Sequence, residues 1–350
     1  MTEIKFLVFA DLHYKKKMYA TATGDLEEIY RRATNEKVDF ILHEGDVCND
    51  YGGSPELRRL LEACPTPYFG VYGNHELETA GNSMQTVTPY ITNRPDRVVW
   101  GSEDGKTGDG AIAYYYYDTD GFRFLFLDTN YSVTPEGKYE HNREGSWGRP
   151  AENTRGDSLG DVQLAWLDRV LTDAAEKGLH CVVNSHAAFC GRWQTSPDHT
   201  AVRMLFAKAN ALKKGTVLMA INGHYHTNRA AVVEDVFYLD VNTAINGWWQ
   251  GEKFHPYAEK DESSPEYTFD YTDYDEDGNA KDTVKMPLSA LRMGAQTLFF
   301  ESPLSATVTV TSEGSITVNG TKTKWRYGIA KDRFSEGTMP EISDHFIKLQ

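Results

Sequence analysis

The first 250 residues alternate short apolar runs with longer amphipathic ones. The short runs are rich in β-branched and aromatic residues, and each ends in a polar or glycine-containing turn. They are residues 4–10, 38–46, 67–73, 179–185 and 215–223. Continuous apolar runs of this length are typical of strands that are buried on both faces of a sheet. We therefore predict these segments as the central strands of the fold.

Amphipathic segments separate the predicted strands. Residues 24–37 have a helical pattern, and in residues 158–177 apolar side chains recur at three- and four-residue steps, with Ser158 available as an N-cap. Strands that alternate with helices predict an α/β fold in which helices cover both faces of the sheet. Asp120-Gly121, between two strand-like runs, predicts an antiparallel hairpin joined to that sheet.

The pattern changes near residue 250. Residues 259–282 are acid-rich, and residues 297–325 resemble strands with a turn at Glu313-Gly314. We predict a catalytic domain of residues 1–250 and a β-rich C-terminal extension of residues 251–350 packed on it. The acidic stretch would form a hairpin or a flap within this extension.

Charge and hydropathy narrow the possible partners. A net charge of -15 argues against nucleic-acid binding, because neutralising a phosphate backbone needs a basic surface. Small phosphorylated molecules remain possible substrates, since a local metal site reverses the sign of the potential. No apolar run approaches the roughly 20 residues that span a bilayer, and the N-terminal residues do not resemble a signal peptide. We therefore expect a cytoplasmic protein; its oligomeric state stays open.

Polar side chains follow each of the five predicted strands. An Asp or His after a strand is more often a turn residue than a ligand, but a series after five strands is hard to attribute to turns. Ligands of α/β sheets lie at the carboxyl ends of strands, so these side chains are expected to converge. They are Asp11 and His13, Asp46, Asn74 and His75, His186, and His224 and His226.

These residue types suit a pair of cations. Imidazole and carboxylate together fit zinc, manganese or iron better than calcium, which prefers oxygen ligands only. Asp46 has two oxygens and can bridge both ions. Glu44 and Glu76, beside the candidate ligands, are expected to orient imidazoles.

The series D-x-H, G-D, G-N-H-E, a single H and G-H-x-H resembles the calcineurin-like metallophosphoesterases over roughly residues 1–245. The resemblance implies an α/β fold, a four-layer α/β/β/α sandwich of mixed sheets, with a two-metal centre. His75 would stay free of metal and face the substrate. One cation would be held by Asp11, His13, Asp46 and His226, and the other by Asp46, Asn74, His186 and His224.

The same resemblance implies a metal-dependent phosphohydrolase that cleaves phosphomonoesters or phosphodiesters of small molecules. A hydroxide bridging the cations would attack in line, and His75, if cationic, would stabilise the transition state or protonate the leaving group. The loops at 77–110, 131–157 and 187–200 are expected to select the substrate.

Two alternatives stay open. Phosphoprotein phosphatases of this family carry Asp and then Arg after G-D, and that Asp orients the catalytic histidine. Here the positions are Asn49 and Asp50, without a following Arg, which weakens that alternative. Phosphodiesterases of the family tolerate Asn at this position. A non-catalytic metal-binding scaffold is the second alternative, and the presence of every ligand and of His75 argues against it.

Overall fold

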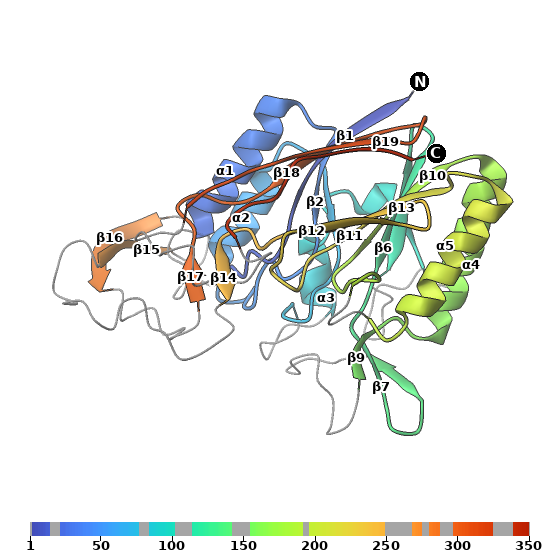
Figure 1. Cartoon of the computed structure of the whole chain (residues 1–350). Coiled ribbons are helices and arrows are strands. Elements are labelled where there is room, and N and C mark those ends of the chain that lie inside the picture. The colour runs from blue at the N-terminus through green and yellow to red at the C-terminus, as the bar shows by residue number, and fades with distance from the viewer. Residues whose placement is uncertain are drawn as a thin grey trace.

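Two mixed β-sheets lie face to face in the computed structural model, with helices on both outer faces (Figure 1). The structure describes residues 2–14, 22–76, 84–101, 114–141, 155–191, 196–248, 268–274, 280–287, 297–324 and 339–349. The layers follow the order α/β/β/α, which confirms the predicted fold class.

The first sheet has the strand order β20-β19-β18-β1-β2-β3. The strands β1 (Glu3–Phe9), β2 (Phe40–His43) and β3 (Tyr68–Gly70) are parallel to one another. The C-terminal strands β18 (Ala306–Thr311), β19 (Ser315–Gly320) and β20 (His345–Lys348) complete this sheet, and β18 is antiparallel to β1. The predicted turn at Glu313-Gly314 joins β18 to β19 and is confirmed. Whether residues 251–350 form a unit of their own stays a prediction.

The second sheet has the strand order β12-β13-β11-β10-β6-β5-β4. Its strands β6, β10, β11 and β13 are parallel, and β5 pairs antiparallel with β6 around Asp120 and Gly121, as the sequence predicted. The bounds are β4 Val99–Trp100, β5 Tyr115–Thr119, β6 Phe122–Leu127, β10 His180–Ser185, β11 Val217–Asn222, β12 Arg229–Val233 and β13 Val236–Asp240.

Three smaller sheets lie outside the sandwich. The strands β7 (Tyr131–Val133), β8 (Tyr139–His141) and β9 (Arg155–Ser158) pair in the order β8-β7-β9. The strand β14 (Asn246–Trp248) pairs with β17 (Thr297–Phe299), and β15 (Thr268–Tyr274) pairs antiparallel with β16 (Ala280–Pro287). The turn between β15 and β16 lies outside the described residues, and a role of this acidic segment as a flap stays a prediction.

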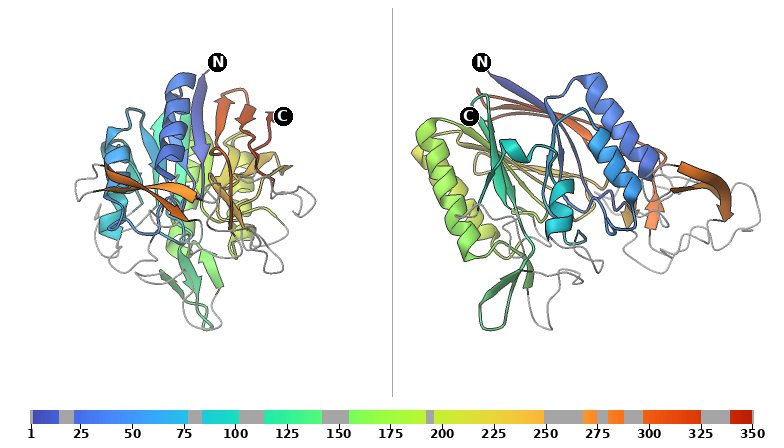
Figure 2. Two further views of the ribbon diagram at one scale, coloured as in Figure 1. Left: turned by 90° about the vertical axis from the view of Figure 1, so that its left-hand side faces the viewer. Right: turned by 180° about the vertical axis from the view of Figure 1, so that it is seen from behind.

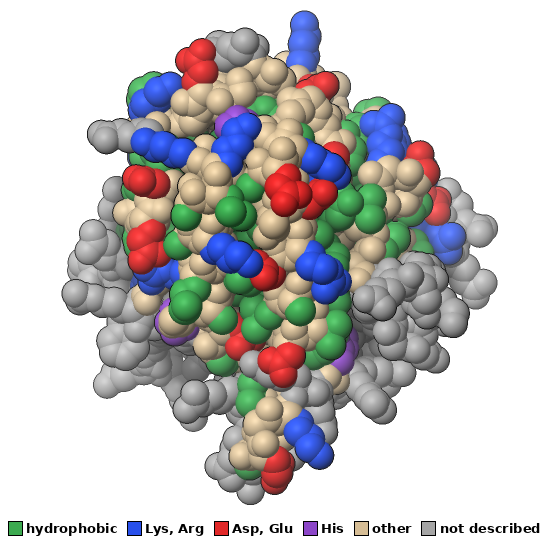
Figure 3. Space-filling view, turned by 90° about the vertical axis from the view of Figure 1, so that its right-hand side faces the viewer, with side chains coloured by type: hydrophobic (Ala, Val, Ile, Leu, Met, Phe, Trp, Pro, Cys, Tyr) green, Lys and Arg blue, Asp and Glu red, His purple; other side chains and the backbone are tan. Residues whose placement is uncertain are grey.

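Helices cover the two outer faces (Figure 2). They are α1 (Ala22–Glu36) and α2 (Pro55–Ala63) beside the first sheet, and α4 (Asp161–Lys177) and α5 (His199–Leu212) on the second, with the short α3 (Met84–Val87) and 3-10 turns at Thr88–Tyr90 and Pro95–Arg97. Figure 3 shows the face of α4 and α5, where acidic and basic side chains are interspersed with apolar ones. No helix in the described part of the chain combines the length and the apolar character needed to cross a membrane.

The predicted N-cap of the long helix is wrong. Helix α4 begins at Asp161 with Gly160 at its N-cap, whereas Ser158 is the last residue of β9 and pairs with Tyr131. The Ser158 backbone is extended by this strand pairing, which the helical periodicity of the following residues does not reveal.

Two hydrophobic cores hold the layers together. The larger one fills the space between the sheets and extends to α1 and α2; there the rings of Phe6 and Phe40 stack, and both contact the ring of Phe124 edge to face. The smaller one lies between the second sheet and the helices α4 and α5, around Leu167 and Phe206. The sandwich thus places the carboxyl ends of the parallel strands of both sheets at one rim.

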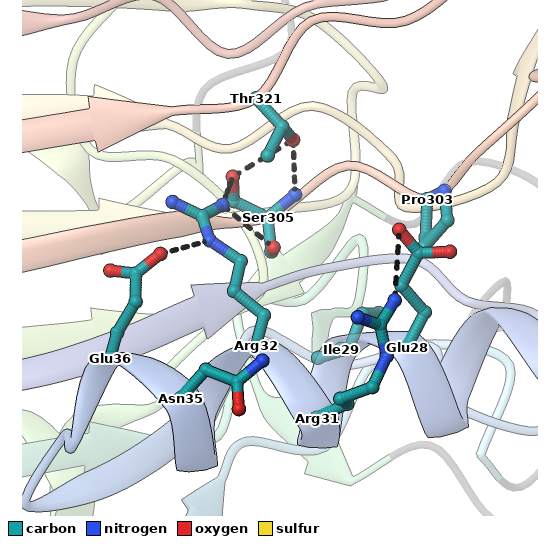
Figure 4. Close-up of a pocket in the computed structure, with 9 residues that line it drawn as sticks. All are labelled: Glu28, Ile29, Arg31, Arg32, Asn35, Glu36, Pro303, Ser305 and Thr321. Carbon is teal, nitrogen blue, oxygen red and sulfur yellow. Dashed lines mark hydrogen bonds and ion pairs between the residues drawn. The ribbon is translucent and has the colours of Figure 1, made fainter.

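Arg32 of α1 ties this helix to the C-terminal strands (Figure 4). Its Nη1 donates to the carbonyl and hydroxyl oxygens of Ser305 at 2.7 and 3.0 Å, and its Nη2 donates to the carbonyl of Asn319 at 3.0 Å. Its Nε donates to Glu36 at 2.7 Å. Arg32, Glu36 and Ser305 border a cavity of about 260 Å³ between α1 and the residues that flank β18 and β19.

We expect Arg32→Ala to lower the free energy of unfolding by about 2 kcal/mol, because charge-assisted hydrogen bonds to half-buried acceptors are lost. Arg31→Ala is a control, since Arg31 lies next to it on α1 and pairs with Glu28 of the same helix. The side chain of Arg32 is 18% exposed and that of Arg31 is 67% exposed. Chemical denaturation measures the free energy of unfolding of both variants. Equal losses of this free energy in the two variants would contradict the role of Arg32.

Candidate metal centre

The predicted site residues converge where strands of both sheets end. Asp11 and His13 follow β1, Asp46 follows β2, and Asn74 and His75 follow β3. His186 follows β10, and His224 and His226 follow β11. The loops of the first sheet are joined by backbone hydrogen bonds, in which Asp11 N donates to Gly45 O at 3.1 Å and His13 N donates to Asp46 O at 2.8 Å. The structure thus gathers at one rim all eight residues that the sequence singled out.

Left-handed backbone is concentrated at this rim. The φ angles are 50° at Asp11, 48° at His13, 52° at Asp46, 72° at His224 and 51° at His226. This conformation costs an L-residue about 1–2 kcal/mol, and such strain clusters at functional sites. Five strained ligand-type residues in one place therefore indicate a site whose geometry is maintained at the expense of local stability.

The loop after β3 approaches the loop after β2 very closely. A Cβ atom at Gly73 would overlap the carboxylate of Asp46, so only glycine fits this position. Gly45 precedes Asp46 with a φ of +87°, a conformation that glycine adopts without strain. The two glycines allow the polar loops to meet at the distances given below.

One group of potential ligands contains Asp11, His13 and His226. The Nε2 atoms of His13 and His226 are 3.1 Å apart, and Nε2 of His226 is 3.5 Å from Oδ1 of Asp11. All three side chains are buried. Three donor atoms that point at a common centre have the arrangement of a cation site.

A second group contains Asp46, His186 and His224, with Asn74 beside it. Nε2 of His186 is 3.2 Å from Oδ2 of Asp46, 3.1 Å from Oδ1 of Asn74 and 3.1 Å from Nδ1 of His224. The same Asp46 oxygen lies 3.9 Å from Nε2 of His13 in the first group. One carboxylate oxygen therefore faces both groups.

The outer nitrogens of three imidazoles face oxygen atoms. Nδ1 of His13 is 3.2 Å from Oδ1 of Asn49, and Nδ1 of His186 donates to the carbonyl of Glu44 at 2.6 Å. Nε2 of His224 is 3.8 Å from Oδ2 of Asp157. An imidazole whose outer nitrogen carries the proton directs the lone pair of its inner nitrogen at a cation. The donor set thus fits the predicted pair of divalent cations.

Glu76 holds together the two loops of the first sheet. Its carboxylate accepts hydrogen bonds from the backbone N–H groups of Asp46, Val47 and Gly73 at 2.8, 2.7 and 2.6 Å, and from the hydroxyl of Tyr51 at 3.1 Å. These contacts position the two loops, and an additional role of the Glu76 side chain in orienting an imidazole stays a prediction. Glu44 orients His186 through its carbonyl rather than its side chain.

His75 lies at the edge of the centre. The backbone N–H of His75 donates to Oδ1 of Asp46 at 2.8 Å, and the ring Nε2 of His75 is 4.0 Å from Oδ2 of Asp46. His13, Asp46 and His75 also lie close enough to form a further group of potential ligands. The distance of 4.0 Å from Nε2 of His75 to Oδ2 of Asp46 is close to the 3.9 Å between Nε2 of His13 and the same oxygen, so a position of His75 beside the cations stays a prediction.

Asn49 connects His75 to the first group, a link that the sequence did not reveal. Its Nδ2 donates to Nδ1 of His75 at 3.0 Å, while its Oδ1 faces Nδ1 of His13. A side-chain amide has one donor end and one acceptor end. When His13 keeps its proton on Nδ1, the amide therefore presents N–H to His75, whose proton then lies on Nε2. The contact favours neutral His75 over the cationic form.

Opposite charges dominate the second group. Burial disfavours the charged form of Asp46, but His186 and His75 outweigh this effect and lower its pKa well below the usual value. Burial also disfavours cationic His186, but the Asp46 carboxylate raises the pKa of that histidine to about 10. His13, by contrast, has its pKa lowered by burial to about 4.

We expect chelator-treated protein to release about one proton when it binds manganese at pH 7, because a cation accepts only neutral imidazole and His186 must lose its proton. Calorimetry in buffers with different protonation enthalpies counts the protons. The His186 pKa is raised from 6.5, so its stabilising effect is complete below pH 6.5 and is lost as the pH rises through 10. The chelator-treated protein should lose stability over that range, and binding without proton release would contradict this assignment.

Comparisons with known proteins agree with this geometry. The family described as Calcineurin-like phosphoesterase matches residues 4–228, more than half of the chain. A manganese-dependent ADP-ribose/CDP-alcohol diphosphatase of Xenopus laevis is 25% identical over 228 residues, which cover 52% of this chain and 64% of the relative. The protein of the same name from Xenopus tropicalis is 28% identical over 183 residues, covering 43% and 53%. The chain thus spans less than two thirds of these relatives.

A solved structure shares the fold. A dimetal phosphatase from Danio rerio superposes with a TM-score of 0.56 at 16% identity, over 99% of each chain. At this identity the likeness concerns the fold alone. The chain belongs to the calcineurin-like phosphoesterase family, which confirms the family that the motifs indicated.

Proposed function

We propose that this chain hydrolyses a diphosphate or phosphodiester bond of a small molecule with the help of two divalent cations, preferably manganese. The observation that carries the proposal is that Oδ2 of Asp46 lies between two groups of inward-facing ligand atoms. The first cation would be held by Asp11, His13, Asp46 and His226, and the second by Asp46, Asn74, His186 and His224.

The bound cations supply Lewis acidity for the phosphoryl group and lower the pKa of attacking water. The side chains of the protein bind and orient the substrate and hold the proton that it needs. His75, with its proton on Nε2, donates a hydrogen bond to a phosphoryl or leaving-group oxygen, and Asn49 keeps the ring in that protonation state. Asp11, His13, Asp46, His186 and His226 are buried, which limits the access of water to them and strengthens their charge interactions.

Two observations favour a diphosphate or diester over a phosphoprotein. The relatives are named as diphosphatases of ADP-ribose and CDP-alcohols, so a nucleoside diphosphate compound is the substrate class that we propose. Asn49 and Asp50 also stand where phosphoprotein phosphatases carry Asp and Arg. The Asn49 amide donates to His75, whereas an Asp would accept from it.

A substrate panel tests the proposal. Manganese-loaded protein is assayed with ADP-ribose, a CDP-alcohol, bis-aryl phosphate, mono-aryl phosphate and a phosphoprotein, alongside metal analysis. We expect two cations per chain and the highest kcat/KM on the diphosphate compounds. Preference for the phosphoprotein would overturn the substrate class. Two bound cations without turnover of any substrate would favour a non-catalytic scaffold.

A further inference from the structure

The strand β9 brings a carboxylate to the metal centre. Asp157 lies in this strand with a φ of 62°, and its Oδ2 is 3.8 Å from Nε2 of His224. The side chain of Asp157 is 37% exposed. No motif in the sequence marks this residue, which belongs to the 131–157 segment expected to influence substrate choice.

His224 differs from its neighbour His186 in what surrounds it. The outer nitrogen of His186 donates to a backbone carbonyl, and its side chain is only 1% exposed. The side chain of His224 is 22% exposed, and its outer nitrogen faces the Asp157 carboxylate. Its inner nitrogen, Nδ1, lies 3.1 Å from Nε2 of His186 and points into the second group. His224 is thus a member of the second group that lies on the solvent-exposed side of the centre.

We propose that Asp157 is a positioning residue for His224, a role that rests on the proposed function of the two-cation centre. Its carboxylate accepts the Nε2 proton of His224 and thereby leaves the Nδ1 lone pair for the second cation. A carboxylate behind a ligating imidazole fixes its protonation and raises its basicity. The separation of 3.8 Å exceeds hydrogen-bond length but lies within ion-pair range.

The backbone around Asp157 supports a fixed position for this carboxylate. Ser158 pairs with Tyr131 of β7, and the N–H of Leu159 donates to Oδ2 of Asp198 at 2.8 Å. On the other side of Asp157, Arg155 pairs with Val133 of β7, so paired residues flank Asp157 within the small β8-β7-β9 sheet. Through Asp157, this sheet becomes part of the second cation site.

Asp157→Asn tests the proposal, because Asn tolerates left-handed backbone and removes only the charge. Asp235→Asn is the matched control, since Asp235 is also left-handed, with a φ of 58°, but is exposed in the turn between β12 and β13. Manganese is titrated into chelator-treated protein by calorimetry. We expect Asp157→Asn and Asp157→Ala to weaken one of the two binding steps by roughly 10–100-fold and to leave the other unchanged.

The control should bind both cations like the wild type, and the Tm of chelator-treated Asp157→Asn should match that of chelator-treated wild type. Unchanged affinity of both steps in the Asp157 variants would overturn the proposal. Equal weakening of both steps together with a lower Tm would also overturn it, because it would indicate a structural role. A wild-type chain that binds fewer than two cations would instead contradict the proposed function.

Discussion

Asp46→Asn is expected to lose both cations and to lower kcat by at least roughly 10³-fold, since the cations contribute several kcal/mol to the transition state. The reason is geometric. Oδ2 of Asp46 lies 3.2 Å from Nε2 of His186 and 3.9 Å from Nε2 of His13, so one atom serves both groups. An amide at this position supplies at most one neutral oxygen and turns N–H groups toward one of the histidines.

Metal analysis of the purified variant and steady-state kinetics measure these effects. Asp240→Asn is the matched control, because Asp240 also ends a parallel strand of the sandwich but belongs to neither group. Burial raises the pKa of Asp240 to about 6, so loss of its charge costs less than at an Asp with an ordinary pKa. The control should keep two cations. An Asp46→Asn variant that also keeps two would contradict the bridging role.

His75→Ala is expected to lower kcat by roughly 10²–10⁴-fold while both cations stay bound. Nδ1 of His75 faces the Asn49 amide donor, which places the ring proton on Nε2, the atom that donates to substrate in the proposed mechanism. Kinetics on metal-replete protein, with metal content measured in the same sample, tests this expectation. Unchanged kcat would remove His75 from the mechanism, and loss of a cation would make it a ligand.

Asn49→Ala extends this test. If Asn49 acts by fixing the proton of His75, the kcat of the double variant His75→Ala/Asn49→Ala should be little lower than that of His75→Ala alone. Additive losses would instead assign Asn49 an independent role, for example through its contact with Nδ1 of His13 at 3.2 Å.

The sequence predicted the ligand-bearing strands well, because each is a short apolar run that ends in a polar turn. It did not reveal that β18 pairs with β1, since a period-two pattern identifies a strand but not its neighbour some 300 residues away. The roles of Asn49 and Asp157 were equally hidden. Both act through side-chain orientation in a loop or strand edge, and no spacing rule connects Asp157 to His224.

The origin of the ligands has a consequence for the whole molecule. Each proposed cation is held from both sheets, the first by residues after β1 and β2 together with His226, and the second by residues after β2 and β3 together with His186 and His224. Two bound cations would then link the two sheets at one end of the sandwich. Separation of the sheets would release both ions, so the manganese concentration in the cell would govern the lifetime of the folded chain as well as its rate of turnover.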